Sequence, residues 1–209
     1  MRKIRQHVNP LGEHFMRVRA RPALRPAGLD PDCRVEVELG CADAEFSFQL
    51  AANHPDWMVV GVEIREPCLE RNRERVQQLG LANRVVADSN LNVDLDQVFA
   101  PRSVDCFHLL FPDPWFKERH RKRRVIEPEL VRVIAGQLRV GGELHVASDV
   151  WDVALEIMEV VEECPQLRNR LAPWSFWRGN PCDAQSRRED TTLRREQRVW
   201  RMRYVLAEG

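Results

Sequence analysis

RVEVELGCADAEFSFQLAANHPDWMVVGVE, residues Arg34–Glu63, is the stretch that decides the fold of this chain. Its two ends, Arg34–Leu39 and Trp57–Glu63, are rich in Val and other apolar residues and are typical of buried strands. Between them, Asp43–Asn53 has the length and composition of a short helix. A strand, a helix and a second strand at this spacing predict two parallel strands joined by a crossover helix.

The same alternation continues along the rest of the chain. It predicts helices at Glu66–Leu79, Glu127–Leu138 and Val150–Glu163, and strands at Arg84–Ala87, Val104–Phe111 and Glu143–Ala147. Gly80 closes the first of these helices, and Gly141-Gly142 predicts a turn before the last of these strands. The final segment, Arg198–Leu206, has no crossover helix before it, which favours an antiparallel strand at the sheet edge. We therefore expect an α/β fold with a doubly wound, mostly parallel sheet.

Length and composition limit the class of protein. The chain has 209 residues, of which 44% are hydrophobic and 31% charged, with a formal net charge of zero. These values predict one globular domain over residues 31–209, preceded by a basic arm over residues 1–30. No apolar run approaches the ~20 residues that span a bilayer, and the basic N-terminus has no apolar segment behind it. We expect a cytoplasmic protein that does not bind membranes.

The six cysteines are scattered, and none forms a C-x-x-C pair. This spacing argues against a disulfide framework or a zinc site, so we expect no metal.

Polar residues follow the first three expected strands, where an α/β sheet binds its ligands. Gly40 stands at the exit of the first strand without a G-x-G-x-x-G motif, which counts against NAD and FAD. Glu63 lies ~20 residues further on, the spacing at which a carboxylate reaches a ribose diol, and Asn90 is placed to bond a base edge. A nucleoside without a pyrophosphate fits this pattern, and S-adenosylmethionine is the leading candidate. Glu63 could instead be a solvated helix cap, and Glu38 a strand residue leaning on a neighbouring Lys or Arg.

The segment FPDPW, Phe111–Trp115, holds an acid between two prolines and two aromatic residues. Directly after it, Lys117–Arg124 is the densest block of positive charge in the chain. A fixed carboxylate can read the edge of a nucleic-acid base while Lys and Arg neutralise the phosphates, so the pattern indicates chemistry on a nucleic acid. The alternative is a solvated charged loop after a strand.

Taken together, four segments resemble one known family. The string FPDPWFKERHRKRR, with GVEIREP before it, GGELHVASD after it and IRQHVNPLG near the N-terminus, is similar to bacterial tRNA (guanine-N7)-methyltransferases. The resemblance runs from about Arg5 to Tyr204. It implies a Rossmann-like, seven-stranded methyltransferase sheet and methyl transfer from S-adenosylmethionine to N7 of a guanine in tRNA. The resemblance also implies that this guanine lies in the variable loop.

The resemblance assigns roles to individual residues. Those matching the cofactor contacts are Glu38, Gly40, Glu63, Asn90 and Asp113, and Asp113 also matches the catalytic residue. Those matching the guanine-side contacts are Lys117, Asp149, Ser186, Arg187, Arg188 and Glu189. Those matching the stretch that touches RNA are Arg119, His120, Arg121, Lys122, Arg123 and Arg124. The residues themselves leave a second reading for Asp149, as an N-cap of the helix beginning at Val150.

One loop departs from the family pattern. Where relatives have G-x-G-x-G or G-C-A-x-G, this chain reads Gly40-Cys41-Ala42-Asp43-Ala44. Ala44 in the place of a glycine predicts a strained backbone, at a cost of ~1 kcal/mol, and Asp43 adds negative charge near the expected position of the cofactor carboxylate. Two alternative functions follow. The chain could be a degenerate relative that binds RNA with weak or no transfer, or a methyltransferase with a non-RNA substrate. It could be a monomer or a homodimer.

Overall fold

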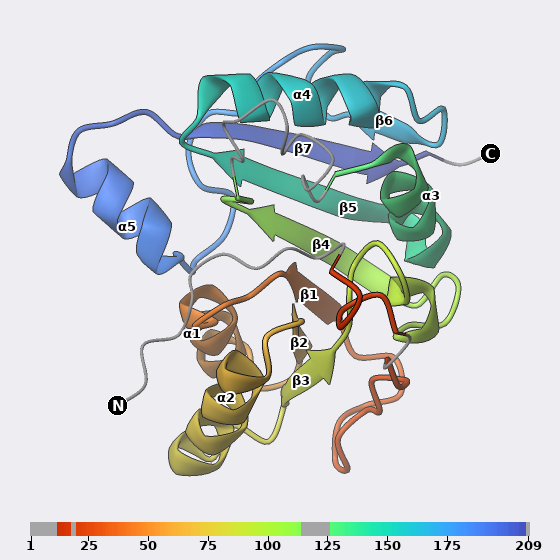
Figure 1. Cartoon of the computed structure of the whole chain (residues 1–209), viewed down its shortest axis with the longest axis vertical. Helices are drawn as coiled ribbons and strands as arrows, with labels where there is room; N and C mark the ends of the chain where they lie inside the picture. The colour runs from red at the N-terminus through yellow and green to blue at the C-terminus, as the bar shows by residue number, and fades with distance from the viewer. Residues whose placement is uncertain (1–11, 18–19, 114–125, 208–209) are drawn as a thin grey trace.

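A computed structural model describes residues 12–17, 20–113 and 126–207 of the chain. Within them lies a seven-stranded sheet with the order β3-β2-β1-β4-β5-β7-β6 (Figure 1). Its strands are β1 Val35–Leu39, β2 Met58–Glu63, β3 Arg84–Asp88, β4 Val104–Leu110, β5 Leu138–Ser148, β6 Leu167–Asn169 and β7 Trp200–Leu206. Strands β1 to β5 run parallel, and β7 is antiparallel to both of its neighbours. The expected mostly parallel sheet with an antiparallel C-terminal strand is therefore confirmed.

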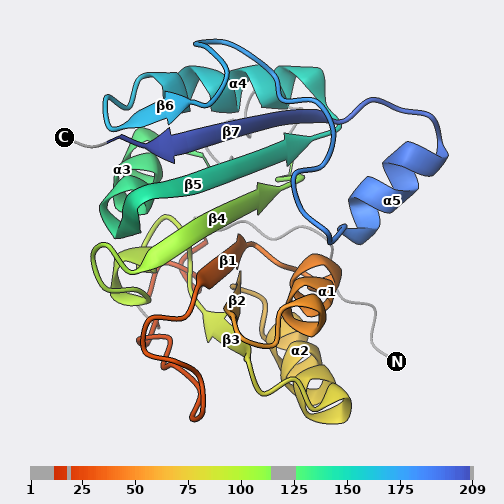
Figure 2. The same cartoon turned by 180° about the vertical axis from the view of Figure 1, so that it is seen from behind.

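Helices cover both faces of the sheet. They are α1 Glu45–Asn53, α2 Glu66–Leu79, α3 Pro128–Gln137, α4 Trp151–Glu162 and α5 Arg187–Arg194, with a short 3-10 helix η1 at Leu95–Gln97. Helices α3 and α4 belong to the large apolar cluster on one face, and α1 packs in a smaller cluster on the other. Figures 1 and 2 show α1 and α2 side by side, and α5 beyond the ends of β4 and β5.

Strand β1 shows why the two faces differ. Successive side chains of a strand point to opposite faces of the sheet, and Val37 and Leu39 point into the large apolar cluster. Glu36 and Glu38 point to the other face, and both are nevertheless buried. Each aliphatic side chain in the large cluster stabilises the fold by about 1.5–3 kcal/mol relative to exposure. The opposite face has to stabilise buried charge by hydrogen bonds and ion pairs instead.

Two sequence expectations fail in detail. Strand β7 is not at the edge, because the unpredicted β6 pairs with its outer side. The expected turn at Gly141-Gly142 is instead a bulge inside β5, which begins at Leu138. Gly142 is required there, since a Cβ would lie 2.9 Å from the Arg139 carbonyl oxygen.

The chain before β1 packs onto the sheet. Ala20, Ala23 and Leu29 contact the large apolar cluster, and the Ala20 amide donates to Asp94 Oδ2 at 2.9 Å. The division into an arm over residues 1–30 and a domain over residues 31–209 stays a prediction. Among the described residues, none of the helices has the length and apolar character needed to cross a membrane.

Candidate active site

The loop between β1 and α1 has an unusual backbone. Gly40, Ala42 and Ala44 all have positive φ, at 69°, 50° and 56°. The expectation for Ala44 is thus confirmed, and Ala42 adopts the same left-handed conformation. Each alanine costs about 1–2 kcal/mol there, because its Cβ crowds the following carbonyl oxygen. This loop also explains why α1 begins at Glu45 rather than at Asp43.

Several hydrogen bonds hold the loop in this shape. The Ala44 amide donates to the Cys41 carbonyl at 2.6 Å, and the Ala42 amide donates to Glu63 Oε2 at 2.9 Å. Asn72, on α2, donates to the Ala42 carbonyl at 3.2 Å. The loop is therefore fixed by β2 and α2, and its strain is balanced before any ligand binds.

Glu63 ends β2 and is only 3% exposed. Its carboxylate accepts from the amides of Ala42, Ile64 and Arg65 and from the Arg65 guanidinium, whose nitrogens lie 2.9–3.0 Å away. Burial alone would raise the pKa of Glu63, but the Arg65 bonds and charge outweigh it and hold that pKa below its ordinary value. The reading of Glu63 as a solvated cap is wrong, because the carboxylate is buried and bonded to the β1–α1 loop.

Glu38 lies on β1 beside Gly61, two residues before Glu63 on β2, and has a different environment. Its carboxylate accepts from the Ser47 hydroxyl at 2.5 Å, while Arg84 donates to that same hydroxyl at 2.8 Å. Burial raises the pKa of Glu38 to about 7, and the bonds from Ser47 and the charge of Arg84 offset that rise only in part. Glu38 therefore faces the first turn of α1, beneath the loop, rather than the solvent.

Asn90 follows β3 and is 5% exposed. Its side-chain amide donates to the Phe15 carbonyl at 2.9 Å, and its backbone amide donates to Asp94 Oδ1 at 2.9 Å. The segment ahead of the domain thus reaches the strand end where a base edge was expected. Nothing in the sequence of residues 12–17 predicts this contact.

Asp113 follows β4, three residues after the strand ends at Leu110. The turn between them is fixed by Phe111, whose φ is 49° and whose amide donates to the Ala147 carbonyl at 2.7 Å. Burial lowers the pKa of Arg65, but Glu63 chiefly, and Asp113 to a smaller extent, raise it above its ordinary value. The charge of Asp113 therefore acts on Arg65, whose guanidinium is bonded to Glu63.

Helix α5 was not expected, although the sequence carries a signal for it. Ser186 caps the helix by accepting from the Glu189 amide at 3.1 Å. Ser-x-x-Glu is the spacing of a capping box, so the pattern Ser186–Glu189 could have placed the helix start. The cap positions the next three residues, each of which contacts a different part of the site.

Two of these residues are exposed arginines that pair with acids of the sheet edge. Arg187 Nε lies 3.1 Å from Asp43 Oδ2, in the strained loop, and Arg188 Nε donates to Asp149 Oδ2 at 2.7 Å. Thr192 also donates to Asp149, at 3.2 Å. Asp149 is therefore not the cap of α4, whose N-cap is Val150.

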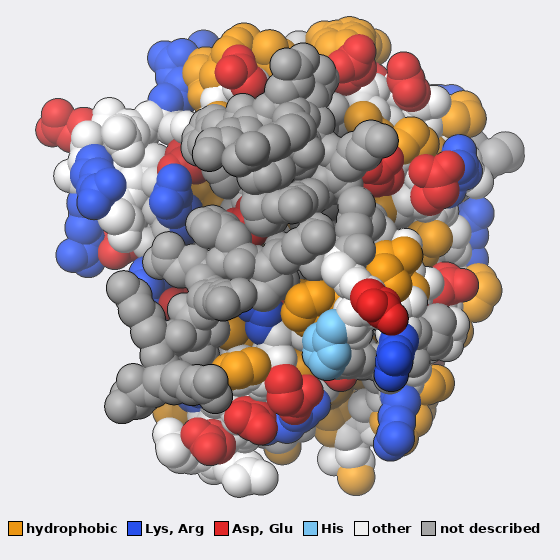
Figure 3. Space-filling model, viewed as in Figure 1, with side chains coloured by type: hydrophobic (Ala, Val, Ile, Leu, Met, Phe, Trp, Pro, Cys, Tyr) orange, Lys and Arg blue, Asp and Glu red, His pale blue; other side chains and the backbone are white. Residues whose placement is uncertain are grey.

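The third residue, Glu189, is 2% exposed and pairs with Arg201 of β7. Figure 3 shows Lys and Arg side chains gathered over α5. The exposed fractions of Arg187 and Arg188, 68% and 60%, agree with this view. The remaining expected contacts fall outside the described residues. They are Lys117, Arg119, His120, Arg121, Lys122, Arg123 and Arg124.

Comparison with known proteins agrees with this architecture. A family model described as "Putative methyltransferase" matches residues 32–202. A tRNA (guanine-N(7)-)-methyltransferase of Synechocystis sp. is 42% identical over 159 residues, 75% of each chain. The protein of the same name from Synechococcus elongatus is 32% identical over 97% of this chain and 96% of its own. The chain belongs to the tRNA (guanine-N(7)-)-methyltransferase family. The resemblance of the chain to this family, expected from the sequence, is thereby confirmed.

Solved structures confirm the fold that this family membership implies. The antibiotic-resistance methyltransferase Kmr matches with a TM-score of 0.56 at 17% identity, covering 88% of this chain and 90% of that one. A SAM-dependent methyltransferase from Aquifex aeolicus matches with a TM-score of 0.57 at 11% identity, covering 83% and 82%. These likenesses show a shared Rossmann-like methyltransferase fold.

Proposed function

We propose that this protein transfers a methyl group from S-adenosylmethionine to N7 of a guanine in tRNA. The observation that carries the proposal is the placement of two acids at the carboxyl ends of parallel strands. Glu63 ends β2 and is bonded to the β1–α1 loop, Asp113 follows β4, and the charges of both act on Arg65. Relatives that are 32–42% identical and named for this reaction support the same assignment.

The residues at the ends of β1 to β3 fit the cofactor. Glu63 offers a carboxylate for a ribose diol, and its bond to the Ala42 amide joins the ribose position to the β1–α1 loop. In this structure the Arg65 guanidinium fills one side of Glu63, so a diol would take over those contacts. Gly40 leaves open space where the chain leaves β1. Glu38 supports the β1–α1 loop from beneath through Ser47, and Asn90 closes the side on which the adenine base would lie.

Bound S-adenosylmethionine supplies a sulfonium methyl group, and the task of the protein is to place the base against it. Guanine N7 carries a free lone pair and needs no deprotonation before it attacks. Holding the two reacting atoms in line can lower the barrier by several kcal/mol. In our proposal Asp113 accepts hydrogen bonds from the N1–H and N2–H₂ edge. These bonds select guanine over adenine and stabilise the cationic methylated ring.

The arginines of α5 supply the substrate side. Arg187 and Arg188 each pair with one acid while remaining mostly exposed. The pair of Arg187 with Asp43 is exposed on both sides, and such pairs are worth about 0–1 kcal/mol, so an RNA phosphate can replace Asp43 at little cost. Asp149, Glu189 and Lys117 then close the guanine pocket, with Ser186 holding the helix start. The basic run Arg119, His120, Arg121, Lys122, Arg123 and Arg124 contacts phosphates in this proposal. A cytoplasmic location accompanies it.

The test is labelled-methyl transfer to bulk tRNA, followed by nucleoside analysis. We expect label in 7-methylguanosine. Binding of tRNA without transfer would support a degenerate relative instead. Cofactor binding without tRNA affinity would point to a non-RNA substrate.

The basic run has a separate test, in a triple variant that neutralises Arg121, Lys122 and Arg123. The tRNA affinity of this variant should depend less on salt. The slope of the logarithm of the affinity against the logarithm of the salt concentration should become shallower by ~1 for each phosphate contact removed. An unchanged slope would mean that the run does not touch RNA.

A further inference from the structure

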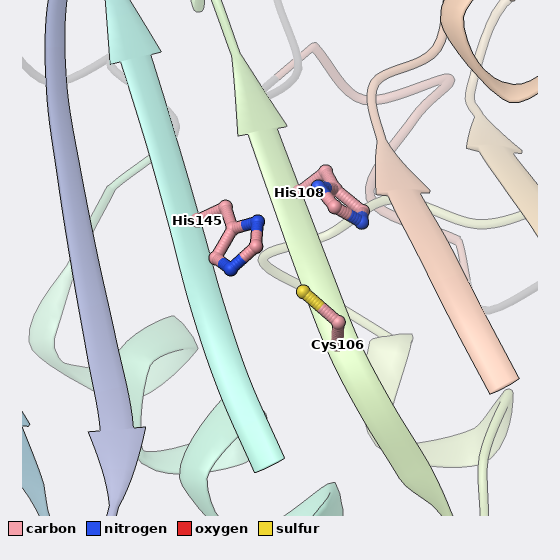
Figure 4. Close-up of side chains that lie close together, drawn as sticks. All are labelled: Cys106, His108 and His145. Carbon is pink, nitrogen blue, oxygen red and sulfur yellow. The ribbon is translucent and has the colours of Figure 1, made fainter. Parts of the chain in front are cut away.

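A buried cluster of thiols and imidazoles lies away from the strand ends, on the face of the sheet that carries α1. Cys106 and His108 are on β4, two residues apart, and His145 is on β5 in register with His108. One ligand-type atom from each of these residues lies within 4.8 Å of those of the other two. Figure 4 shows the three side chains on the same side of the two strands.

A fourth residue of the same kind comes from far along the chain. Cys182 stands in the segment between β6 and α5, and its Sγ lies 3.7 Å from His145 Nδ1. Its amide donates to Asn180 Oδ1 at 2.9 Å, and Ala184 packs against Phe46 and Leu50 of α1. Cys182 is therefore held beside β5 by a fixed loop.

The outer nitrogens of both imidazoles face carboxylates. His108 Nε2 pairs with Glu36, and His145 Nε2 contacts Glu143 Oε2 at 2.5 Å. These contacts leave the Nδ1 atoms for the thiols. Indeed His108 Nδ1 is buried and finds no hydrogen-bond partner among the residues that the structure describes. A carboxylate on the outer nitrogen is the support that metal-binding histidines generally have.

From these contacts we infer that Cys106, His108, His145 and Cys182 form a structural zinc site. Two thiolates and two imidazoles are a common tetrahedral zinc set. Bond lengths of ~2.3 Å to sulfur and ~2.0 Å to nitrogen imply S···N separations of roughly 3.6 Å, close to the observed contact between Cys182 and His145. Because two thiolates balance the zinc charge, the ion adds no net charge to the interior.

The space beside the cluster suits one ion. A small, partly open cavity lies there, and its lining includes His108, His145 and Cys182 but not Cys106. Its room for water-sized groups, about 20 Å³, is enough for a single ion. Zinc in this position would tie the segment before α5 to the centre of the sheet, and so fix the start of the helix that carries Ser186. Sequence spacing does not reveal the site, since its ligands come from two strands and a distant loop.

The experiment measures metal in the full-length protein after expression with added zinc and gel filtration. We expect about one zinc per chain, with an X-ray absorption shell of two sulfur and two nitrogen atoms. Cobalt in place of zinc should give the visible bands of a tetrahedral ion and a sulfur-to-metal charge-transfer band. Cys182→Ser should lose the metal and the sulfur band, whereas Cys164→Ser, a buried control outside the cluster, should keep both.

Two results would overturn the inference. One is a folded wild-type protein with no retained zinc and no tetrahedral cobalt spectrum, which would leave two buried histidine–carboxylate pairs. The other is zinc retained equally by wild type, Cys182→Ser and Cys106→Ser, which would place the metal elsewhere. Should Cys182→Ser fail to fold, the absorption spectrum of the wild type still decides the ligand set. Methyl-transfer activity does not enter these readouts, so the inference can fail independently of the proposed function.

Discussion

The two halves of the sheet's carboxyl edge are built by different means. On the β1–β3 side, Glu63 is 3% exposed and bonded to backbone amides, and the neighbouring loop holds two alanines at positive φ. On the α5 side, Arg187 and Arg188 are 68% and 60% exposed, and they pair with the exposed Asp43 and the largely buried Asp149. The first half is preformed by burial and strain, whereas the second is closed by contacts that water and salt can replace.

This difference matches what each half would bind in the proposed function. A small cofactor gains from a rigid site, because fewer groups need to be ordered when it binds. A large polyanion gains from arginines that can exchange a carboxylate for a phosphate. The cofactor half should therefore respond to pH and to backbone changes, and the α5 half to ionic strength.

The largest expected effect on stability concerns Glu38. Burial raises its pKa from 4.5 to about 7, so folded protein holds a proton that unfolded protein releases between these values. The stabilisation of the folded state by this bound proton is complete below about pH 4.5 and is lost as the pH rises through 7. Wild type loses this stabilisation as the pH rises, whereas Glu38→Gln has no proton to lose. The free energy of unfolding of the variant minus that of wild type should therefore increase by on the order of 2–3 kcal/mol from pH 5 to pH 8. Urea denaturation without cofactor at both pH values measures this change. A difference that stays constant with pH would mean that Glu38 is ionised throughout.

Glu63→Gln should have the next largest effect. The change removes the charge that pairs with Arg65, and hydrogen bonds to a charged group are worth about 1.5–3 kcal/mol each. We expect a loss of about 2 kcal/mol in the free energy of unfolding, and cofactor affinity weaker by roughly 10- to 100-fold. Chemical denaturation and calorimetric titration with S-adenosylhomocysteine measure the two.

The matched control for that variant is Glu66→Gln. Glu66 also pairs with an arginine, Arg73, but is 53% exposed, so its loss should cost less than about 0.5 kcal/mol. Equal effects in the two variants would remove the distinction between a buried and a solvated carboxylate at this edge.

On the α5 side, Arg188→Ala should mainly affect the substrate. We expect KM for tRNA to rise about fivefold at low salt and less at high salt, with little change in stability. Arg194→Ala is the control, because Arg194 lies on the same helix, is 78% exposed and pairs with Asp190 of its own helix. Steady-state methyl transfer at two salt concentrations compares them. If both variants behave alike, α5 supplies only general positive charge.

The smallest effects are expected in the strained loop. Ala42→Gly should stabilise the protein by about 0.5–1 kcal/mol, because glycine adopts positive φ without the Cβ penalty. Ala44→Gly should change stability little, since Ala44 is fully buried and its methyl group contributes about 0.8 kcal/mol by packing. Thermal unfolding of both variants tests this contrast. Stabilisation by Ala44→Gly and not by Ala42→Gly would contradict it.

Local pattern was enough to predict most of the fold. Alternation of short apolar runs with helical segments gave the parallel strands, and Gly80 marked the end of α2, where its φ is 63°. Strand β6 was not predicted because it has only three residues and depends on β7 for its pairing. Helix α5 was not predicted because it is mostly polar, so the spacing of apolar residues gives no signal there.

The sequence predicted where Glu63 and Asn90 lie in the fold, but not which groups they contact. The strand ends after β2 and β3 correctly placed Glu63 and Asn90 at one edge, because parallel strands end together. The partners of Glu63 and Asn90, Arg65 and the Phe15 carbonyl, follow from side-chain reach and chain path, which periodicity does not encode. For the same reason, Cys106 and Cys182 give no signal as a pair in the sequence.

In the proposed function Asp113 acts between the two halves, and one paired measurement tests this role most directly. Wild type and Asp113→Asn are compared for the rate of 7-methylguanosine formation in tRNA and for the dissociation constant of S-adenosylhomocysteine. We expect kcat to fall by roughly 10²–10³-fold while the dissociation constant stays within a few-fold of wild type. Unchanged formation of 7-methylguanosine by the variant would contradict the account, because the acid at the junction would then have no part in placing the base.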